Sequence, residues 1–262
     1  MARKRTVWAD GLTMAGSEAG GRALRGPAVV TGAARGIGEA IARRLAADGA
    51  REGQNERSTE VIEVAGGHGG VAAVADLRDP DELRAAVNEV VAELGGCWVL
   101  VNNAGRFLKQ PLLDTDVEEW DDLHALNSRA ALLPTQVVAP TMLRAGGGRI
   151  VNQATLAAKL GTAGEAAYAA SQASLVALSR ISAMALGVHH LPVTAVCPGY
   201  VLTEMGAGTR DPEQIATWEA RSPLGRLATP ADVASAVAHL ASDDAAYVTG
   251  EAINVTGGMC TW

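Results

Sequence analysis

Short runs of aliphatic and β-branched residues recur along the chain and alternate with longer segments in which apolar residues have helical spacing. Short apolar runs without polar alternation are typical of parallel strands that are buried on both faces. These runs cover residues 28–30, 70–74, 98–101, 149–152 and 192–196. The segments with helical spacing cover residues 38–48, 81–94, 118–143, 166–187 and 230–241.

Repeated alternation of strand and helix predicts a Rossmann-type, doubly wound parallel α/β sheet. A chain of 262 residues can bury the core of such a sheet as a single domain. We expect residues 25–262 to form this domain and residues 1–24, which are polar and rich in glycine, to form a flexible tail. Asp79 followed by Pro80 is a good helix start, with Asp79 as the N-cap.

Composition and charge narrow the classes of partner. The net charge of −7 provides no broad basic surface, so we expect no nucleic acid to bind. No stretch of about 18 consecutive apolar residues is present, so no membrane span is expected. The three cysteines are odd in number and widely spaced, and the five histidines are scattered. We therefore expect no disulfide framework, no metal site and a cytoplasmic location, with a small molecule as the ligand.

The first motif with a chemical meaning follows the first strand directly, where a doubly wound sheet binds its ligand. It reads Thr-Gly-Ala-Ala-Arg-Gly-Ile-Gly over residues 31–38. Glycines permit a sharp turn from strand to helix and let a pyrophosphate approach the free N–H groups of the helix N-terminus. By itself, however, glycine spacing is also compatible with a turn that binds nothing.

The spacing Gly-xxx-Gly-x-Gly resembles that of the short-chain dehydrogenase/reductase family, and three further motifs follow in the order found in that family, between about Leu24 and Trp262. The resemblance implies a nicotinamide dinucleotide cofactor and hydride transfer to or from a small carbonyl compound or secondary alcohol. It also implies a homodimer or homotetramer in which the predicted helices over residues 118–143 and 166–187 pair with those of a second copy. The cofactor-binding residues implied are Gly32, Arg35, Gly36, Ile37, Gly38, Asp76, Leu77, Asn103, Ala104, Gly105, Pro198, Gly199, Val201 and Thr203.

The resemblance also implies a catalytic set. Tyr168 matches the family's acid/base tyrosine, Thr155 falls where a serine orients the substrate, and Asn127 matches the asparagine of the proton relay. The family's lysine, four residues after the tyrosine, is replaced by Gln172. Glutamine can still hydrogen-bond the nicotinamide ribose, but it cannot lower the tyrosine pKa as a cation does, by roughly 1–3 units.

A second departure concerns the strand that the family places after the first helix. No apolar residue occurs between Ala50 and Val61, so this strand is either missing or severely shortened. Arg35, with Arg51 or Arg57, could receive a 2′-phosphate, which favours NADP(H) weakly over NAD(H). These arginines could equally be solvated surface residues.

Because both departures affect the cofactor's riboses, two other functions stay open beside hydride transfer. One is a redox-neutral dehydratase, cyclase or isomerase that uses Tyr168 and Thr155 without a cofactor. The other is a non-catalytic subunit. Residues near 203–222 correspond to the family's substrate lid, where Met205, Trp218 and the preceding Tyr200 could line an apolar pocket.

Overall fold

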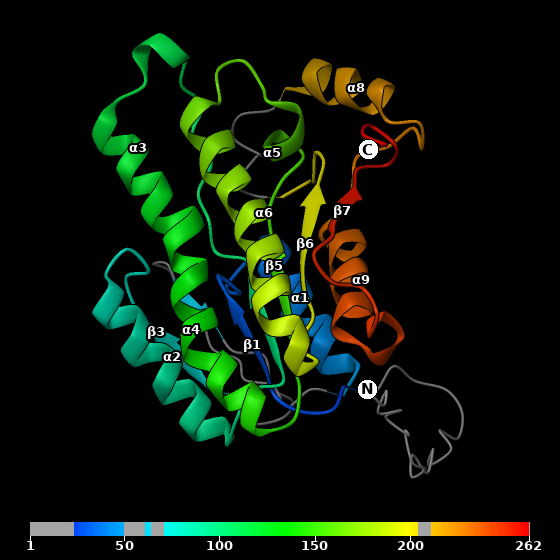
Figure 1. Ribbon diagram of the computed structural model, residues 1–262. Coiled ribbons are helices and arrows are strands. Elements are labelled where there is room, and N and C mark those ends of the chain that lie inside the picture. Colours follow the sequence, from blue (N-terminus) through cyan, green and yellow to red (C-terminus); the bar gives the residue numbers. More distant parts are fainter. Residues whose placement is uncertain (1–23, 50–60, 64–70, 204–210, 262) are drawn as a thin grey trace, which may run out of the picture.

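The computed structural model describes residues 24–49, 61–63, 71–203 and 211–261. The expected tail before Leu24, the arginines at 51 and 57, and Met205 lie outside the described residues. The described strands form one sheet in the order β3-β2-β1-β4-β5-β6-β7 (Figure 1). The strands are β1 (Ala28–Thr31), β2 (Val61–Glu63), β3 (Ala72–Val74), β4 (Val99–Asn102), β5 (Arg149–Gln153), β6 (Val193–Pro198) and β7 (Ala252–Val255).

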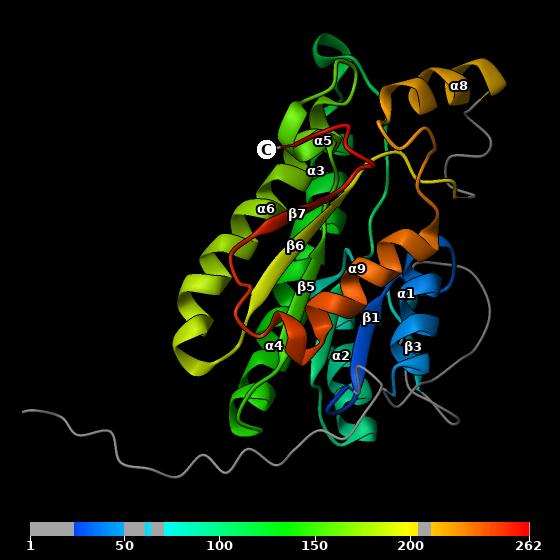
Figure 2. The same ribbon diagram turned by 90° about the vertical axis from the view of Figure 1, so that its right-hand side faces the viewer.

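Helices cover both faces of the sheet, as the doubly wound prediction requires (Figures 1 and 2). The helices α1 (Gly36–Ala47) and α9 (Pro230–Ala241) share one face, and α2 (Pro80–Leu94), α4 (Ala130–Arg144) and α6 (Ala166–Leu186) share the other. The shorter elements are α3 (Val117–His124), α5 (Ala157–Leu160), α8 (Pro212–Arg221), η1 (Leu112–Asp114), η2 (Ala125–Arg129), η3 (Gly187–His189) and η4 (Asp243–Ala245).

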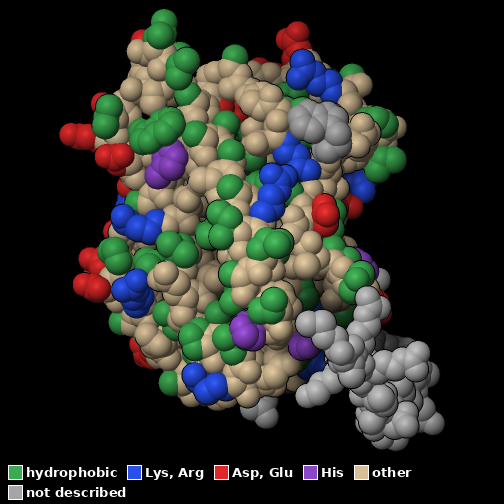
Figure 3. Space-filling view, viewed as in Figure 1, with side chains coloured by type: hydrophobic (Ala, Val, Ile, Leu, Met, Phe, Trp, Pro, Cys, Tyr) green, Lys and Arg blue, Asp and Glu red, His purple; other side chains and the backbone are tan. Residues whose placement is uncertain are grey.

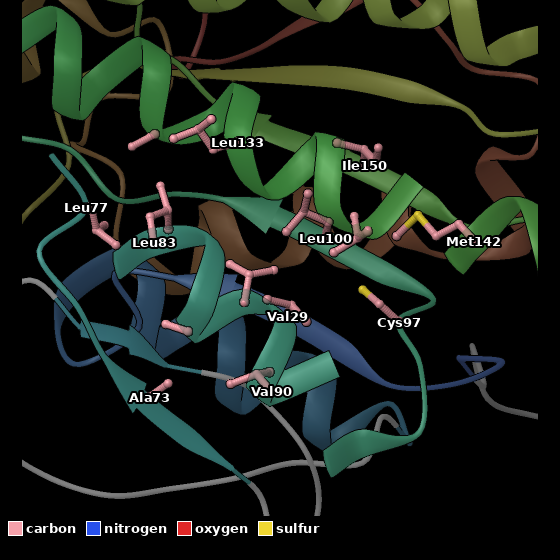
Figure 4. Packing of buried hydrophobic residues seen from close by; sticks show 14 of the residues in the cluster. Val29, Ala73, Leu77, Leu83, Val90, Cys97, Leu100, Leu133, Met142 and Ile150 are labelled. Atoms are coloured by element: carbon pink, nitrogen blue, oxygen red, sulfur yellow. The ribbon is translucent and has the colours of Figure 1, made fainter. Parts of the chain in front are cut away.

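The core divides into two layers because successive strand residues point to opposite faces. Val29 and Leu100 pack towards α2 and α4, together with Met142 of α4 (Figure 4). Val30 and Val101, their neighbours along the same strands, pack towards α1 and α9. The strands β1 and β4 are buried at every position, which explains their continuous apolar sequences.

The strand β2 departs from the predicted all-parallel sheet. It is present but only three residues long, and it runs antiparallel to both β1 and β3. The pairs β1–β4, β4–β5, β5–β6 and β6–β7 are parallel. A parallel connection needs a crossover of a dozen or more residues, and the chain between Glu63 and Ala72 is too short for one. Val61 therefore pairs with Val74 near the carboxyl edge of the sheet, and Glu63 pairs with Ala72 towards the opposite edge.

The predicted helix over residues 118–143 is interrupted by one π-helical turn, Ala125–Arg129. Such turns are rare and occur often at functional sites. This one contains Asn127, which is buried. The predicted N-cap is confirmed, since the Asp79 carboxylate accepts hydrogen bonds from the N–H groups of Asp81 and Glu82.

By length and composition alone, one described helix, Ala166–His189, could span a membrane. It passes this test although it lacks a continuous apolar run, because its polar residues are mostly serines and its many alanines are mildly apolar. One side of the helix packs on the sheet through Leu175, Val176 and Ala183. A core helix of a soluble protein meets the same criterion.

Truncation of a central core residue tests this packing. Leu100 on β4 has no exposed surface, so we expect Leu100→Ala to lower the free energy of unfolding by about 2–5 kcal/mol. Urea denaturation followed by circular dichroism measures the change. Leu113→Ala is the matched control because this side chain is 96% exposed, and we expect a change within about 0.5 kcal/mol. Equal losses in the two variants would contradict the assigned core.

Candidate active site

Hydrogen bonds join the glycine turn after β1 to the segment that follows β4. The Thr31 hydroxyl accepts from the backbone N–H groups of Asn103 and Ala104, at 3.0 and 3.1 Å. The Asn103 amide in turn donates to the carbonyl oxygens of Thr31 and Gly32, at 2.9 and 3.0 Å. Two predicted motifs separated by about seventy residues in the chain thus form one rigid unit.

Two glycines of this turn are sterically required. A Cβ on Gly32 would lie 2.8 Å from the Ala104 Cα, and a Cβ on Gly38 would lie 2.1 Å from the Gly32 carbonyl oxygen. Gly32 and Gly36 also have φ near +66° and +62°, where side chains are strained. The turn therefore leads directly into α1 and presents the N–H groups of its first turn, as an anion site requires.

Arg35 and Ile37 flank this helix start differently. Arg35 is the exposed N-cap of α1 in an extended conformation, and its side chain makes no capping hydrogen bond. Ile37 is half-buried and packs against the core layer of α1 and α9. The Arg35 side chain can therefore reach a ligand at the turn.

The segment after β6 approaches the same turn from the other side. Gly199 packs closely on the C-terminal segment, since a Cβ there would lie 3.3 Å from the Thr256 Cα. Val201 forms an isolated bridge with Ala228. Thr203 then reaches the glycine turn, because a Cβ on Gly36 would lie 3.8 Å from the Thr203 methyl group. Pro198 ends β6 and is buried.

Asp76 and Leu77 lie beyond β3. The Asp76 carboxylate accepts hydrogen bonds from the side chain and backbone N–H of Arg78. Leu77 is fully buried in the core, so only its backbone could meet a ligand.

The structure brings Tyr168 and Thr155 together. Tyr168 lies near the start of α6, Thr155 follows β5, and the two side chains are hydrogen-bonded. Burial raises the pKa of Tyr168 to about 12; the hydrogen bond from Thr155 opposes this rise and the nearby Glu165 carboxylate adds to it. Sequence reasoning missed Phe107, the chain's only phenylalanine, whose ring meets that of Tyr168 edge-on with centroids 5.0 Å apart.

Asn127 is 1% exposed, and its side chain fixes the backbone of Arg106. Its Oδ1 accepts from the Arg106 N–H at 2.8 Å, and its Nδ2 donates to the Arg106 carbonyl and to the Ser171 hydroxyl, both at 3.0 Å. The Arg106 guanidinium forms ion pairs with Glu119 and Asp122. Sequence reasoning missed Arg106 and Ser171, although Ser171 stands between the two residues singled out on α6.

Gln172 lies one helical turn after Tyr168 and is 5% exposed. Its Oε1 is buried and has no hydrogen-bond partner among the described residues. Its Nε2 lies near the Asn-Asn-Ala-Gly segment, 3.7 Å from where a Cβ on Gly105 would be. An unpaired buried carbonyl oxygen costs free energy, so it marks a place for a ligand that donates a hydrogen bond.

In the part of the chain that the structure describes, no group of three or more His, Cys, Asp or Glu side chains could hold a metal ion.

Comparisons with known proteins identify the family. A family model described as enoyl-(acyl carrier protein) reductase matches residues 32–260. The 3-oxoacyl-(acyl-carrier-protein) reductase FabG of Staphylococcus aureus is 37% identical over 241 residues, which cover 88% of this chain and 97% of the relative. The chain belongs to the short-chain dehydrogenase/reductase family.

Another relative and a solved structure agree. FabG of Escherichia coli strain K12 is 36% identical over 235 residues, with 88% of this chain and 96% of the relative covered. A crystal structure of a putative NAD(P)-dependent gluconate 5-dehydrogenase from Beutenbergia cavernae, with bound NADP, matches with a TM-score of 0.83 and 37% identity, over 92% of this chain and 99% of that one.

The chain is thus an NAD(P)-dependent oxidoreductase of this family that acts on carbonyl or alcohol substrates, which confirms hydride transfer as the function. Its residues fit such a dinucleotide. The tight turn at Gly32 and Gly36 leads into the first turn of α1, whose N–H groups suit a pyrophosphate, and the buried Gln172 oxygen has no hydrogen-bond partner among the described residues.

The elevated pKa of Tyr168 can be measured directly. We expect Tyr168 to stay protonated up to about pH 11, because its pKa is about 12. Since the folded pKa lies above the ordinary value of 10.0, Tyr168 contributes stability below pH 10 that is lost as the pH rises. Absorbance titration at the phenolate band of native protein and Tyr168→Phe measures this, with circular dichroism to verify folding.

Gln172→Lys serves as the contrast in that titration. We expect a cation one turn away to lower the pKa of Tyr168 by roughly 1–3 units. A phenolate signal that appears at pH 10 in native protein and is absent from Tyr168→Phe would contradict the assigned environment.

Proposed function

We propose that the protein is an NADPH-dependent carbonyl reductase in which a protonated Tyr168 delivers the proton. The observation that carries this proposal is the Tyr168–Thr155 pair, which lacks a neighbouring cation among the described residues and has the Glu165 carboxylate beside it. Such surroundings favour the neutral phenol. A phenol that keeps its proton suits the reductive direction, in which an acid must donate.

Each residue then has a role. Tyr168 donates its proton to the carbonyl oxygen of the substrate, and Thr155 holds that oxygen by a hydrogen bond. A nicotinamide dinucleotide supplies the hydride. Asn127 fixes the backbone of Arg106 and touches Ser171, so it maintains the distance between α6 and the segment after β4.

Gln172 takes the place of the family's lysine and is expected to accept a hydrogen bond from the nicotinamide ribose through its unpaired Oε1. Glutamine thus retains the ribose contact without adding positive charge next to Tyr168. Gly105, Asn103 and Ala104 would form the neighbouring wall, and Asp76 with the Leu77 backbone would meet the adenine.

The direction of β2 supports the preference for NADP(H). Because β2 is antiparallel to β1, the chain runs away from the glycine turn as it leaves β2 at Glu63, which pairs with Val30 and with Ala72. Arg35, exposed at the start of α1, is then free to bind a 2′-phosphate. Gly199, Val201 and Thr203 would close over the other half of the cofactor.

Calorimetric titration with NADPH and NADH tests the cofactor assignment. We expect native protein to bind NADPH more tightly than NADH, and Arg35→Ala to weaken NADPH binding about 10-fold while leaving NADH unchanged. Arg43→Ala is a matched control, because Arg43 also lies on α1 but pairs with Glu39. Absence of binding by either nucleotide would overturn the proposed function.

We further propose that the protein forms a homodimer or homotetramer through the face of α4 and α6. On this face α6 lies beside the continuous helical run of α3, η2 and α4 (Figure 1), and a groove of about 700 Å³ runs between α6 and the part formed by α3 and η2, with Leu132 of α4 also lining it. In Figure 3 hydrophobic side chains are scattered over the middle of this face, and acidic side chains gather at its left edge. The groove is lined by Asp121, His124, Ala125, Ser128, Arg129, Leu132, Ser174, Ala177, Leu178 and Ile181.

The side of α6 that faces away from the sheet exposes apolar residues that a protein partner would cover. Ile181 is 66% exposed and Met184 is 82% exposed, although both belong to a helix that already buries its other side on the sheet. A helix that is apolar on both sides is normally buried on both. A second copy of the same helix would cover this side.

The mass of the native protein and of Ile181→Asp in solution tests this interface. We expect light scattering to give a multiple of the chain mass for the native protein and a single chain mass for Ile181→Asp at micromolar concentration, because a carboxylate would be desolvated in the interface. Val74→Asp is the control, since Val74 is 71% exposed on β3 and lies outside this face. A native monomer would refute the interface.

The state of the three cysteines is relevant to the cellular compartment in which the protein is found. Cys97, Cys197 and Cys260 are all buried and belong to no disulfide, and burial raises the pKa of Cys97 to about 12 and that of Cys197 to about 11. Such thiols are inert and act as small apolar side chains. They suit the reducing cytoplasm, which we propose as the location.

A further inference from the structure

Two aromatic pairs lie at the carboxyl edge of the sheet. In the first, Phe107 meets the catalytic ring of Tyr168 edge-on, at an interplanar angle of 84°. In the second, Tyr200 stacks on Trp218 of α8, with centroids 4.2 Å apart and an angle of 9°. The chain has few aromatic residues, 3% of the total, so four of them in two pairs near one site is a marked concentration.

The order of the strands places one aromatic residue on each side of Thr155. Phe107 follows β4, Thr155 follows β5 and Tyr200 follows β6, and these three strands are neighbours in that order. Because the carboxyl ends of parallel strands meet at one edge, Thr155 lies between Phe107 and Tyr200 along that edge. A carbonyl group held by Thr155 would therefore have aromatic rings to both sides.

Phe107 belongs to a short strap, residues 106–110, which is fixed at both ends. At one end the Asn127 side chain binds the backbone N–H and carbonyl of Arg106. At the other end the Gln110 N–H donates to the Gly164 carbonyl at 2.6 Å. Phe107 is 39% exposed, so its ring covers Tyr168 on one side and still offers apolar surface on the other.

The charges around the strap disfavour an anionic substrate. Arg106 is committed to ion pairs with Glu119 and Asp122, and Lys109 faces the half-buried Glu165. The remaining charged residues between 105 and 122 are acidic: Asp114, Asp116, Glu118 and Asp121. A substrate that carries phosphate groups would meet net negative charge near the strap.

We propose that Phe107 is a specificity-determining residue and that the substrate is an uncharged ketone whose carbonyl belongs to, or adjoins, a flat ring system. This inference rests on the proposed function and adds the substrate class to it. In the step itself the carbonyl π bond breaks, the carbon gains a hydride from the reduced nicotinamide, which is oxidised, and the oxygen gains the Tyr168 proton. The ring of the substrate lies against Phe107 while this happens.

Competing ketones test the substrate class. The probes are 1-tetralone, which is flat and aromatic, 2-decanone, which is linear with the same number of carbons, and acetoacetyl-coenzyme A, which is linear and polyanionic. We expect kcat/KM with NADPH to be about 10-fold higher for 1-tetralone than for 2-decanone, since an aromatic contact adds to simple burial. Acetoacetyl-coenzyme A should be the poorest substrate.

Variants assign the preference to Phe107. We expect Phe107→Leu, which keeps an apolar side chain, to reduce the preference for 1-tetralone over 2-decanone roughly 3- to 10-fold and to leave NADPH affinity unchanged. Tyr247→Leu is the matched control, because Tyr247 is fully exposed and lies after η4. An unchanged preference in Phe107→Leu, or a higher kcat/KM for either linear substrate, would overturn the proposal.

Binding measurements separate this proposal from the one on which it rests. Calorimetric titration of 1-tetralone and 2-decanone into protein with and without saturating NADP⁺ reports the same preference where turnover is slow. Failure of nucleotide binding defeats the proposed function, yet the ketone titration still measures the dependence on Phe107. Nucleotide binding with equal affinity for the two ketones defeats only the substrate class.

Discussion

The hydrogen bonds between Thr31 and Asn103 are the constraint on which the site depends. They tie the end of β1 to the end of β4: Asn103 donates from its backbone N–H and its side-chain amide, and Thr31 accepts through its hydroxyl and its carbonyl oxygen. The glycine turn and α1 extend from one side of this link. The strap with Arg106 and Phe107 extends from the other. Adjacent parallel strands end at one edge, so a single pair of side chains sets the separation between the phosphate site and the substrate site.

Most of the fold could be predicted from the sequence because its strands are buried on both faces. The runs around Val29 and Leu100 are almost entirely apolar, and the helices between the strands keep a clear spacing. The predicted boundaries agree with the observed ones to within a few residues. Periodicity contains no information about strand direction, however. The strand β2 is antiparallel because its connection to β3 is too short for a parallel crossover. This length indicates the direction only when β3 is already known to be a neighbour of β2 in the sheet.

The candidate site could be predicted in part for a related reason. Tyr168, Thr155 and Asn127 belong to motifs with fixed spacing, so the sequence was enough to single them out. Phe107, Arg106 and Ser171 belong to no motif; they reach the site because Asn127 sits in a π-helical turn and bonds to the strap and to α6. Contacts of this kind depend on how two helices and a loop pack, and local sequence does not determine them.

In the proposed function, the two departures from the family pattern act at opposite ends of the dinucleotide. At the adenosine end, β2 runs antiparallel and pairs Glu63 with Val30, and Arg35 is exposed at the start of α1. At the nicotinamide end, Gln172 replaces a cation and leaves a buried acceptor. Arg35 supplies positive charge where a phosphate would bind. Gln172 in place of lysine removes positive charge where a phenolate would form. At neutral pH these surroundings keep Tyr168 protonated, which is the form that reduction needs at its start. Proton donation then leaves a phenolate that burial and the Glu165 charge penalise, so the same surroundings are expected to slow proton transfer in either direction.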